Sequence, residues 1–185
     1  YQVNYKKIVP KIHLIRYADD FIVTAKDRET IETVILPLVR NFMAERGLTL
    51  SEEKTKITHI SEGFDFLGFN IRKFPNNTLL TQPSSDAKKR FCDKIRKVIE
   101  SNKTAKQHSL IKMLNPIITG WGNYYKYGTS AETFHRVDWE IHRKLWQWAR
   151  RRHSNKSKGW IKDKYFKTVN GRKWRFMADM EERSK

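Results

Sequence analysis

Two adjacent carboxylates, Asp19 and Asp20, are the residues whose type and position most clearly suggest chemistry. They lie between two apolar runs within residues 11–25, a pattern that predicts two short strands and a tight connection. Such a pair must be solvated, paired or bound to a cation, because burying a bare carboxylate is costly. Mg²⁺ prefers oxygen ligands and keeps water molecules and substrate phosphates in the rest of its shell. The pair is therefore a candidate Mg²⁺ site, and the alternative is an ordinary Asp-rich turn.

A helix is predicted directly after these strands, over residues 28–46. Asp27 is suited to its N-cap and Gly47 to its C-cap. Pro37 lies inside the pattern and predicts a kink or a split into two helices. The expected apolar stripe consists of Ile31, Ile35, Leu38 and Phe42.

More strands are expected before a change of pattern. One is predicted over residues 54–60, and residues 63–73 indicate a strand pair or hairpin. The stretch 74–85 is rich in Pro, Asn, Ser and Thr, which is typical of a boundary. Residues 1–80 therefore indicate an α+β domain of antiparallel strands with a packing helix.

Residues 86–153 have a helical period and predict a three-helix bundle. The first helix has an apolar stripe, the second surrounds Leu110 and is interrupted by Pro116, and the third begins at a capping box over residues 129–132. Residues 154–159 are expected to be a linker, and residues 160–176 a short β-rich or irregular appendage. The apolar stripe of the first of these three helices comprises Phe91, Ile95, Val98 and Ile99.

The charge of the chain is strongly asymmetric. Lys and Arg number 38 against 20 Asp and Glu, a net charge of +18. Residues 1–85 hold 12 basic and 10 acidic residues, a net of +2, and residues 86–185 hold 26 and 10, a net of +16. With 12% aromatic residues this is a folded basic surface, which favours a nucleic-acid partner over ribosomal or membrane-surface binding.

Other features concern the compartment. A single cysteine, Cys92, excludes an intrachain disulfide and fits a reducing environment. No apolar run of about 18 residues and no basic-then-apolar leader is present. We therefore expect a cytoplasmic or organellar-matrix protein that is not secreted. The histidines are not spaced with cysteine as in a zinc site, and no HNH-type endonuclease signature is found.

The sequence over residues 15–23, IRYADDFIV, resembles the catalytic YxDD hairpin of reverse transcriptases, in the form found in group II intron reverse transcriptase/maturases. Residues 47–55 are similar to the stretch after the motif D helix, and residues 66–69, FLGF, resemble the primer-gripping turn. GWGNYY at 120–125 is similar to the thumb, or X (maturase), domain. The resemblance implies a partial right-hand polymerase palm at 1–80 followed by a basic thumb at 86–153.

The resemblance also implies roles for individual residues. Asp19 and Asp20 would belong to a two-Mg²⁺ site, and Tyr17 and Ala18 would lie against the primer–template pair. Lys54 matches a motif D lysine that could protonate pyrophosphate, although an exposed lysine is the alternative. Primer positioning would involve Phe66, Leu67 and Gly68, with a simple core role for Phe64 and Phe66 as the alternative.

One family feature is missing. An active palm needs a further aspartate upstream of the hairpin, and the 16 residues before Tyr17 contain no Asp or Glu. The chain also opens on Tyr1 rather than Met. We therefore expect an incomplete portion that is inactive alone, with its metal site completed by residues outside it.

The basic half is expected to bind nucleic-acid backbones, although a solvated helix face is the alternative for any single residue. Tyr124 and Tyr125 are candidates for stacking on unpaired bases, whereas Trp121 is expected in the bundle core. Residues 154–185 form a basic appendage that could begin a DNA-binding region. The candidate RNA-binding residues are Lys88, Lys89, Lys94, Lys97, Tyr124, Tyr125, Arg150, Arg151, Arg152, Lys156 and Lys158.

The combined prediction is an RNA-directed DNA polymerase and maturase that assists group II intron splicing and mobility. Its expected partners are intron RNA, a template–primer duplex, target DNA, dNTPs and the remaining fingers and palm. The alternatives are a non-catalytic RNA-binding splicing factor and a retron or CRISPR-associated reverse transcriptase. The intact Asp19–Asp20 pair argues against the splicing factor, since a pure binder gains little from it.

Overall fold

The computed structural model describes residues 11–178. Contacts divide the chain into two compact units, residues 1–59 and 60–185. The outer ends of the predicted domains at 1–80 and 154–185 therefore lie outside the described residues. The boundary between the two units lies before the FLGF segment, whereas the sequence predicted a domain boundary at 74–85.

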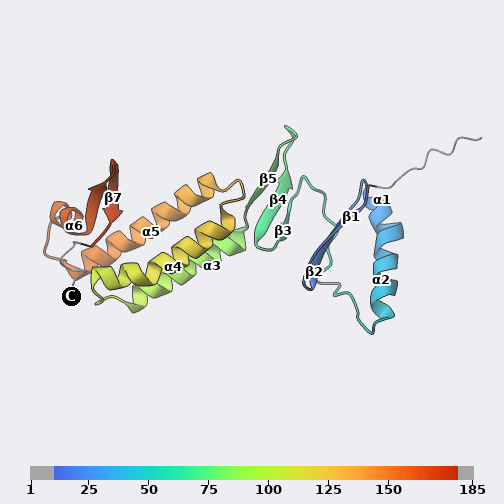
Figure 1. Ribbon diagram of the computed structural model, residues 1–185, viewed down its shortest axis with the longest axis horizontal. Coiled ribbons are helices and arrows are strands. Elements are labelled where there is room, and N and C mark those ends of the chain that lie inside the picture. The colour runs from blue at the N-terminus through green and yellow to red at the C-terminus, as the bar shows by residue number, and fades with distance from the viewer. Residues whose placement is uncertain (1–10, 179–185) are drawn as a thin grey trace, which may run out of the picture. The chain divides into compact units, whose positions relative to one another are not determined.

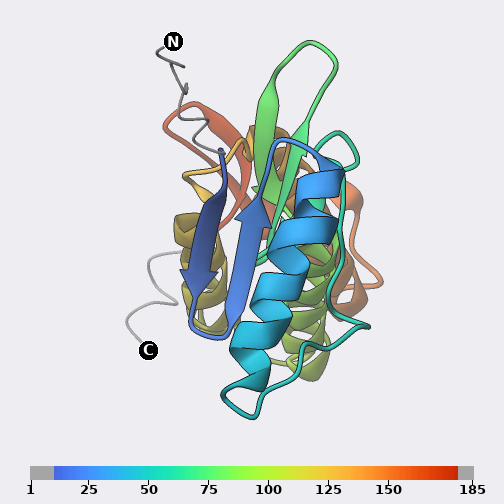
Figure 2. The same ribbon diagram turned by 90° about the vertical axis from the view of Figure 1, so that its right-hand side faces the viewer.

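The first unit is a β-hairpin with a helix beside it (Figure 2). Strands β1 (His13–Tyr17) and β2 (Asp20–Thr24) pair antiparallel, from His13 opposite Thr24 to Tyr17 opposite Asp20. The helix consists of α1 (Arg28–Thr30), the π-helical turn η1 (Ile31–Ile35) and α2 (Leu36–Ala44). Asp27 is its N-cap as predicted, and its carboxylate accepts a hydrogen bond from the Thr30 N–H at 2.8 Å.

The π turn changes which helix face is covered. Pro37 lacks an N–H group and lies in the first turn of α2, directly after η1, so the helix is segmented there as predicted. A π turn inserts one extra residue, which moves the stripe by one position. Leu38 and Phe42 are therefore exposed at 65% and 52%, contrary to the predicted stripe, while Val39 and Met43 are half-buried.

The helix ends through Gly47, whose φ is +66°. The Gly47 N–H donates to the Ala44 carbonyl and the Leu48 N–H to the Met43 carbonyl, which is a Schellman motif. The strand predicted over 54–60 does not form, because residues 54 and 60 lie in turns and residues 55–59 belong to neither a helix nor a strand. Alternating residues alone cannot form a strand without a partner edge.

The second unit begins with an antiparallel sheet in the order β3–β4–β5. Its strands are β3 (Phe64–Phe66), β4 (Phe69–Lys73) and β5 (Leu79–Pro83). The predicted hairpin over 63–73 is confirmed. Residues 74–85, the predicted boundary, contain a turn, the whole of β5 and the N-cap of the next helix.

Three long helices follow, α3 (Ser85–Ser101), α4 (Gln107–Tyr125) and α5 (Ala131–Arg152). In Figure 1 the sheet lies at one end of these helices, and α6 and β7 lie at the other. Their facing stripes form one core, which includes Phe91, Ile95, Ile99, Leu110, Leu114, Val137, Ile141, Leu145 and Trp148.

Two details of these helices differ from the predictions. Helix α4 continues through Pro116, because Pro116 is exposed and the carbonyl that loses its donor can be hydrated. The capping box does not form. Ser130 is the N-cap of α5, but its hydroxyl donates to the Tyr125 carbonyl at 2.9 Å and so closes the preceding helix instead.

The C-terminal segment is part of this core rather than an appendage. It contains α6 (Lys158–Tyr165), β6 (Phe166–Val169) and β7 (Arg172–Phe176). The strands are joined by an Asn170–Gly171 turn with φ of 49° and 73°, as in a type I′ turn. Apolar residues of α6 and β6 belong to the bundle core, namely Ile161, Tyr165 and Phe166. Within residues 11–178, no helix has the length and hydropathy needed to cross a membrane.

Candidate functional site

The carboxylate pair lies at the tip of the β1–β2 hairpin. Tyr17 pairs with Asp20, so Ala18 and Asp19 are the two central turn residues. Ala18 has a φ of +53° and Asp19 does not have a positive φ, which is the pattern of a type II′ turn. Glycine usually occupies that first position, and a residue with a Cβ there is strained. The tight turn thus places Asp19 and Asp20 at the tip of the hairpin.

The hairpin tip is open to solvent. Tyr17, Ala18, Asp19 and Asp20 are all exposed, and Tyr17 is 65% exposed. The two carboxylates supply oxygen ligands of the kind that Mg²⁺ prefers. Among the described residues no group of three His, Cys, Asp or Glu side chains could hold a metal. The chemistry of the pair fits two oxygen ligands of a metal ion.

Lys54 lies elsewhere in the same unit. It is exposed in a turn over residues 52–54, and its backbone N–H donates to the Ser51 carbonyl at 3.2 Å. Within residues 11–178 its side chain forms no ion pair with Asp19 or Asp20. The exposed-lysine alternative describes this position, and a role at the hairpin stays a prediction.

The FLGF segment forms a second tight turn, between β3 and β4. Leu67 and Gly68 have φ of 50° and 79°, as in a type I′ turn. Both turn carbonyls accept hydrogen bonds from the end of α4. The Tyr124 hydroxyl donates to the Leu67 carbonyl at 2.9 Å, and the Tyr125 hydroxyl to the Gly68 carbonyl at 3.3 Å. The GWGNYY segment therefore holds the turn to the bundle, a contact that sequence reasoning missed.

The same tyrosines pack around Phe69. Its ring stacks on Tyr124 at 5.5 Å and meets the edge of Tyr125 at 4.8 Å. Tyr125 is only 6% exposed, and this burial raises the pKa of its hydroxyl. The prediction that Tyr125 stacks on an RNA base is wrong, because neighbouring rings already cover it. Tyr124 is 52% exposed and keeps one side open.

Trp121 packs inside the bundle as expected. Its ring stacks on Phe91 at 4.5 Å and also contacts Tyr125 and Phe134. Phe64 and Phe66 are half-buried on one face of β3, which agrees with the core alternative.

The predicted RNA-binding cations differ in what they already contact. Arg152 donates to the carbonyls of Lys103 and Ala105, both at 2.9 Å, and its guanidinium lies over the Trp148 ring. Arg152 therefore holds the loop between α3 and α4 to the end of α5. Lys88 is half-buried, and the remaining predicted cations are exposed: Lys89, Lys94, Lys97, Arg150, Arg151, Lys156 and Lys158.

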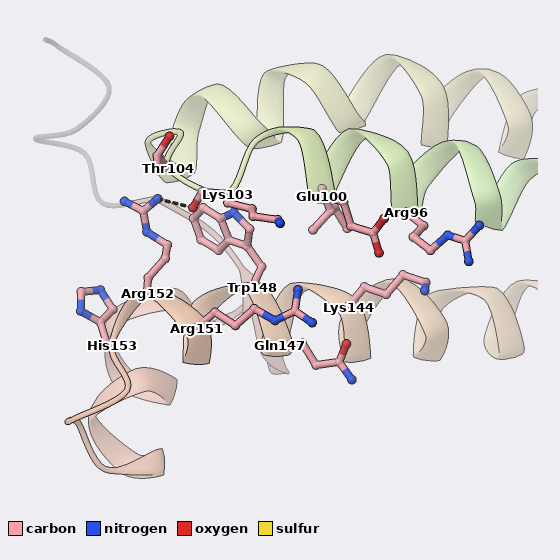
Figure 3. Close-up of a pocket in the computed structure, with 11 residues that line it drawn as sticks. Arg96, Glu100, Lys103, Thr104, Lys144, Gln147, Trp148, Arg151, Arg152 and His153 are labelled. Atoms are coloured by element: carbon pink, nitrogen blue, oxygen red, sulfur yellow. Dashed lines mark hydrogen bonds between the residues drawn. The ribbon is translucent and has the colours of Figure 1, made fainter.

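A basic recess that the sequence did not reveal lies between α3 and α5 (Figure 3). Its volume is about 450 Å³. Arg96 and Glu100 enter it from α3, and Lys144 and Arg151 from α5. The signal in the sequence was the spacing of Lys144, Gln147 and Arg151, which lie on one face of a helix.

Models of two protein families match different parts of the chain. Residues 2–71 match the reverse transcriptase (RNA-dependent DNA polymerase) family, and residues 88–166 match the group II intron maturase-specific domain. The chain is 36% identical over 108 residues to the group II intron-encoded protein LtrA of Lactococcus lactis subsp. cremoris, covering 50% of this chain and 17% of that protein.

Two fungal proteins are also similar. The chain is 29% identical over 147 residues to an uncharacterized 91 kDa protein in the cob intron of Schizosaccharomyces pombe, covering 63% of this chain and 17% of that protein. It is 31% identical over 70 residues to a putative COX1/OXI3 intron 2 protein of Saccharomyces cerevisiae, covering 37% of this chain and 8% of that protein. The chain thus spans a small part of each relative.

Proposed function

Because this chain belongs to the group II intron-encoded reverse transcriptase and maturase family, we propose that it contributes to RNA-directed DNA synthesis and to the splicing and mobility of an intron. The hairpin unit and the β3–β5 sheet would form part of a right-hand polymerase palm. Helices α3–α5 would form the thumb, or X, domain. In this proposal the partners are intron RNA, a template–primer duplex, target DNA and dNTPs.

The observation that carries the polymerase proposal is the turn at Ala18. It leaves Asp19 and Asp20 exposed at the tip of two paired strands, within the segment that matches reverse transcriptases. Paired strands with an exposed acidic tip suit a site that must accept a bulky nucleic-acid substrate.

Asp19 and Asp20 would hold divalent metal, with other ligands from the rest of the polymerase. Bound Mg²⁺ would lower the pKa of the primer 3′-hydroxyl and neutralise charge on the triphosphate. Tyr17 and Ala18 would limit how the terminal base pair lies against the tip. The turn at Leu67 and Gly68 of the FLGF segment, called the FLG turn below, is held by Tyr124 and Tyr125 and would position the primer strand.

The polymerase proposal is tested by primer extension on an RNA template with Mg²⁺, using the full-length polypeptide that contains this chain. Asp19→Asn keeps the size of the side chain and removes its charge, and it is expected to abolish extension. Glu29→Gln removes an exposed carboxylate from the same unit, outside every motif named above, and should leave extension unchanged. Extension that survives in the Asp19 variant would contradict a metal-ligand role.

A second candidate is a splicing factor without polymerase activity, which the maturase-specific match over residues 88–166 favours. The two candidates differ in a direct measurement. A folded full-length protein that binds a structured group II intron more tightly than an RNA duplex of equal length, yet extends no primer, would support the splicing factor. A retron or CRISPR-associated role would show no preference for the intron.

A further inference from the structure

We propose that the recess between α3 and α5, with an adjoining recess at α6, binds the phosphates of a single RNA strand, with Arg151 between the two phosphate positions. This inference rests on the proposed function, because it requires RNA to be the ligand of the basic unit. It adds a defined site, the kind of RNA that the site takes and the residues that bind it.

The first recess is strongly cationic. Five of its lining side chains are basic and one, Glu100, is acidic. Two of the five are already engaged, because Arg96 pairs with Asp93 at 3.1 Å and Arg152 donates to backbone carbonyls. Lys103, Lys144 and Arg151 keep their donors available, since none of them has an ion pair or hydrogen bond within residues 11–178.

Lys144 is the least ordinary of these cations. It is half-buried on α5 and extends into the space between the helices (Figure 3). A partly buried ammonium group without a carboxylate partner pays a desolvation penalty that a bound anion would offset. Arg151 extends into the same space, and its planar guanidinium suits a phosphate.

A second recess of about 400 Å³ adjoins the first. The two share Gln147, Arg151 and His153. The second adds Arg150, Lys156 and Lys158, so the cationic surface continues from α5 toward α6. Two adjoining cationic recesses with a shared arginine match consecutive phosphates along one strand.

The geometry favours a single strand over a duplex. The walls of the first recess belong to two packed helices, whose axes lie about 8–10 Å apart in such packing. Both strands of an A-form duplex do not enter such a recess together, whereas one flexible sugar–phosphate strand can follow the cationic lining from the first recess into the second. Stacking on a base is excluded at Trp148, because this ring is 3% exposed and covered by Arg152. The site therefore contacts backbone and is not specific for sequence.

This site is separate from the FLG turn. The turn is held at the C-terminal end of α4 and by the N-cap of α3, whereas the recess is lined from the C-terminal halves of α3 and α5. Helix α3 has 17 residues, and the two sites therefore lie about 20 Å apart along the bundle. An RNA strand bound in the recess is thus not the primer end at the turn.

The test measures binding of the 185-residue chain to fluorescein-labelled oligouridylate of 12 nucleotides, and to a 12-base-pair RNA duplex. The variant Lys144→Gln/Arg151→Gln should weaken oligouridylate binding about tenfold and reduce its salt slope by about 1.4, or about 0.7 per lost phosphate contact. Duplex binding should change by less than about twofold. The control Lys112→Gln/Arg175→Gln removes the same charge from exposed positions outside both recesses.

A third variant guards against misfolding. Glu100→Gln removes the carboxylate from the recess and should tighten oligouridylate binding, an outcome that loss of structure would not produce. Equal weakening by the recess variant and the control, or no tightening by Glu100→Gln, would overturn the proposed site while leaving the proposed function intact. Failure of the unaltered chain to bind either RNA would overturn both.

Discussion

At the residue scale, Gly68 has two separate reasons to be glycine. Its φ is +79°, and a Cβ there would lie 2.6 Å from the Tyr125 hydroxyl oxygen. Gly171 occupies the equivalent position of another type I′ turn, with φ of +73° and no atom within 4 Å of an added Cβ. The two glycines therefore form a matched pair in one unit.

Gly68→Ala is expected to destabilise the chain by about 2–3 kcal/mol, because backbone strain and the clash add together. Gly171→Ala should cost only the strain, about 1 kcal/mol. Urea unfolding followed by tryptophan fluorescence measures both, since all six tryptophans lie in this unit. Equal losses would mean that the tyrosine contact with the turn contributes nothing.

His142 predicts a dependence of stability on pH. Its ring contacts those of Phe166 and Trp174, its Nε2 is buried without a hydrogen-bond partner in the described chain, and burial lowers its pKa below 6.5. The unfolded chain therefore binds more protons below pH 6.5. The stability linked to neutral His142 is complete above pH 6.5 and is lost as the pH falls through the depressed pKa.

His142→Phe should make the unfolding free energy less dependent on pH between about 5 and 7, since it removes this proton binding. His135→Phe, at an exposed position on the same helix, should leave the dependence unchanged. Chemical unfolding at several pH values measures both, and parallel pH profiles for wild type and His142→Phe would contradict the interpretation.

At the element scale, the π turn decides which side of α2 is covered. A regular helix would bury Leu38, but the extra residue in η1 buries Val39 partly instead and leaves Leu38 65% exposed. Val39→Asp should therefore increase amide exchange of α2 by about tenfold or more, whereas Leu38→Asp should have little effect. Hydrogen exchange followed by mass spectrometry measures the effect of each variant. A larger effect of Leu38→Asp than of Val39→Asp would contradict the proposed shift of the covered face.

The elements were largely predictable where their causes are local. The Asp27 cap, the Gly47 ending, the paired strands around the acidic turn and the apolar stripe of α3 all depend on neighbouring residues. The predictions failed where a partner at a distance decides. The Ser130 hydroxyl donates to a carbonyl of the previous helix and accepts no hydrogen bond from an N–H of the helix that it begins.

At the scale of the whole molecule, the units differ in how much they bury. Among described residues 11–59, Ile35 is the one buried side chain, whereas residues 60–178 contain the extended core. Amides of β1 and β2 should therefore exchange at least about a hundredfold faster than those of the core turns of α3 and α5. Equal protection in the two units, measured on the isolated chain, would contradict this expectation.

The sequence by itself determined the local and additive properties. It placed an acidic turn between two strands, three helices after residue 85 and a charge of +16 in the second half. These follow from the order of residues along the chain and from sums over residues, so no knowledge of distant contacts is required.

Only the tertiary structure decided which side chains remain free to act. Tyr124 and Leu67 are 57 residues apart in sequence and joined by a hydrogen bond, and Arg152 is committed to carbonyls 47 and 49 residues away. Lys144 and Arg151 acquire a shared recess only when α3 packs beside α5. The burial of a side chain and its hydrogen-bond partners depend on residues that are distant in the sequence and close in space. They are therefore decided only when the elements pack together.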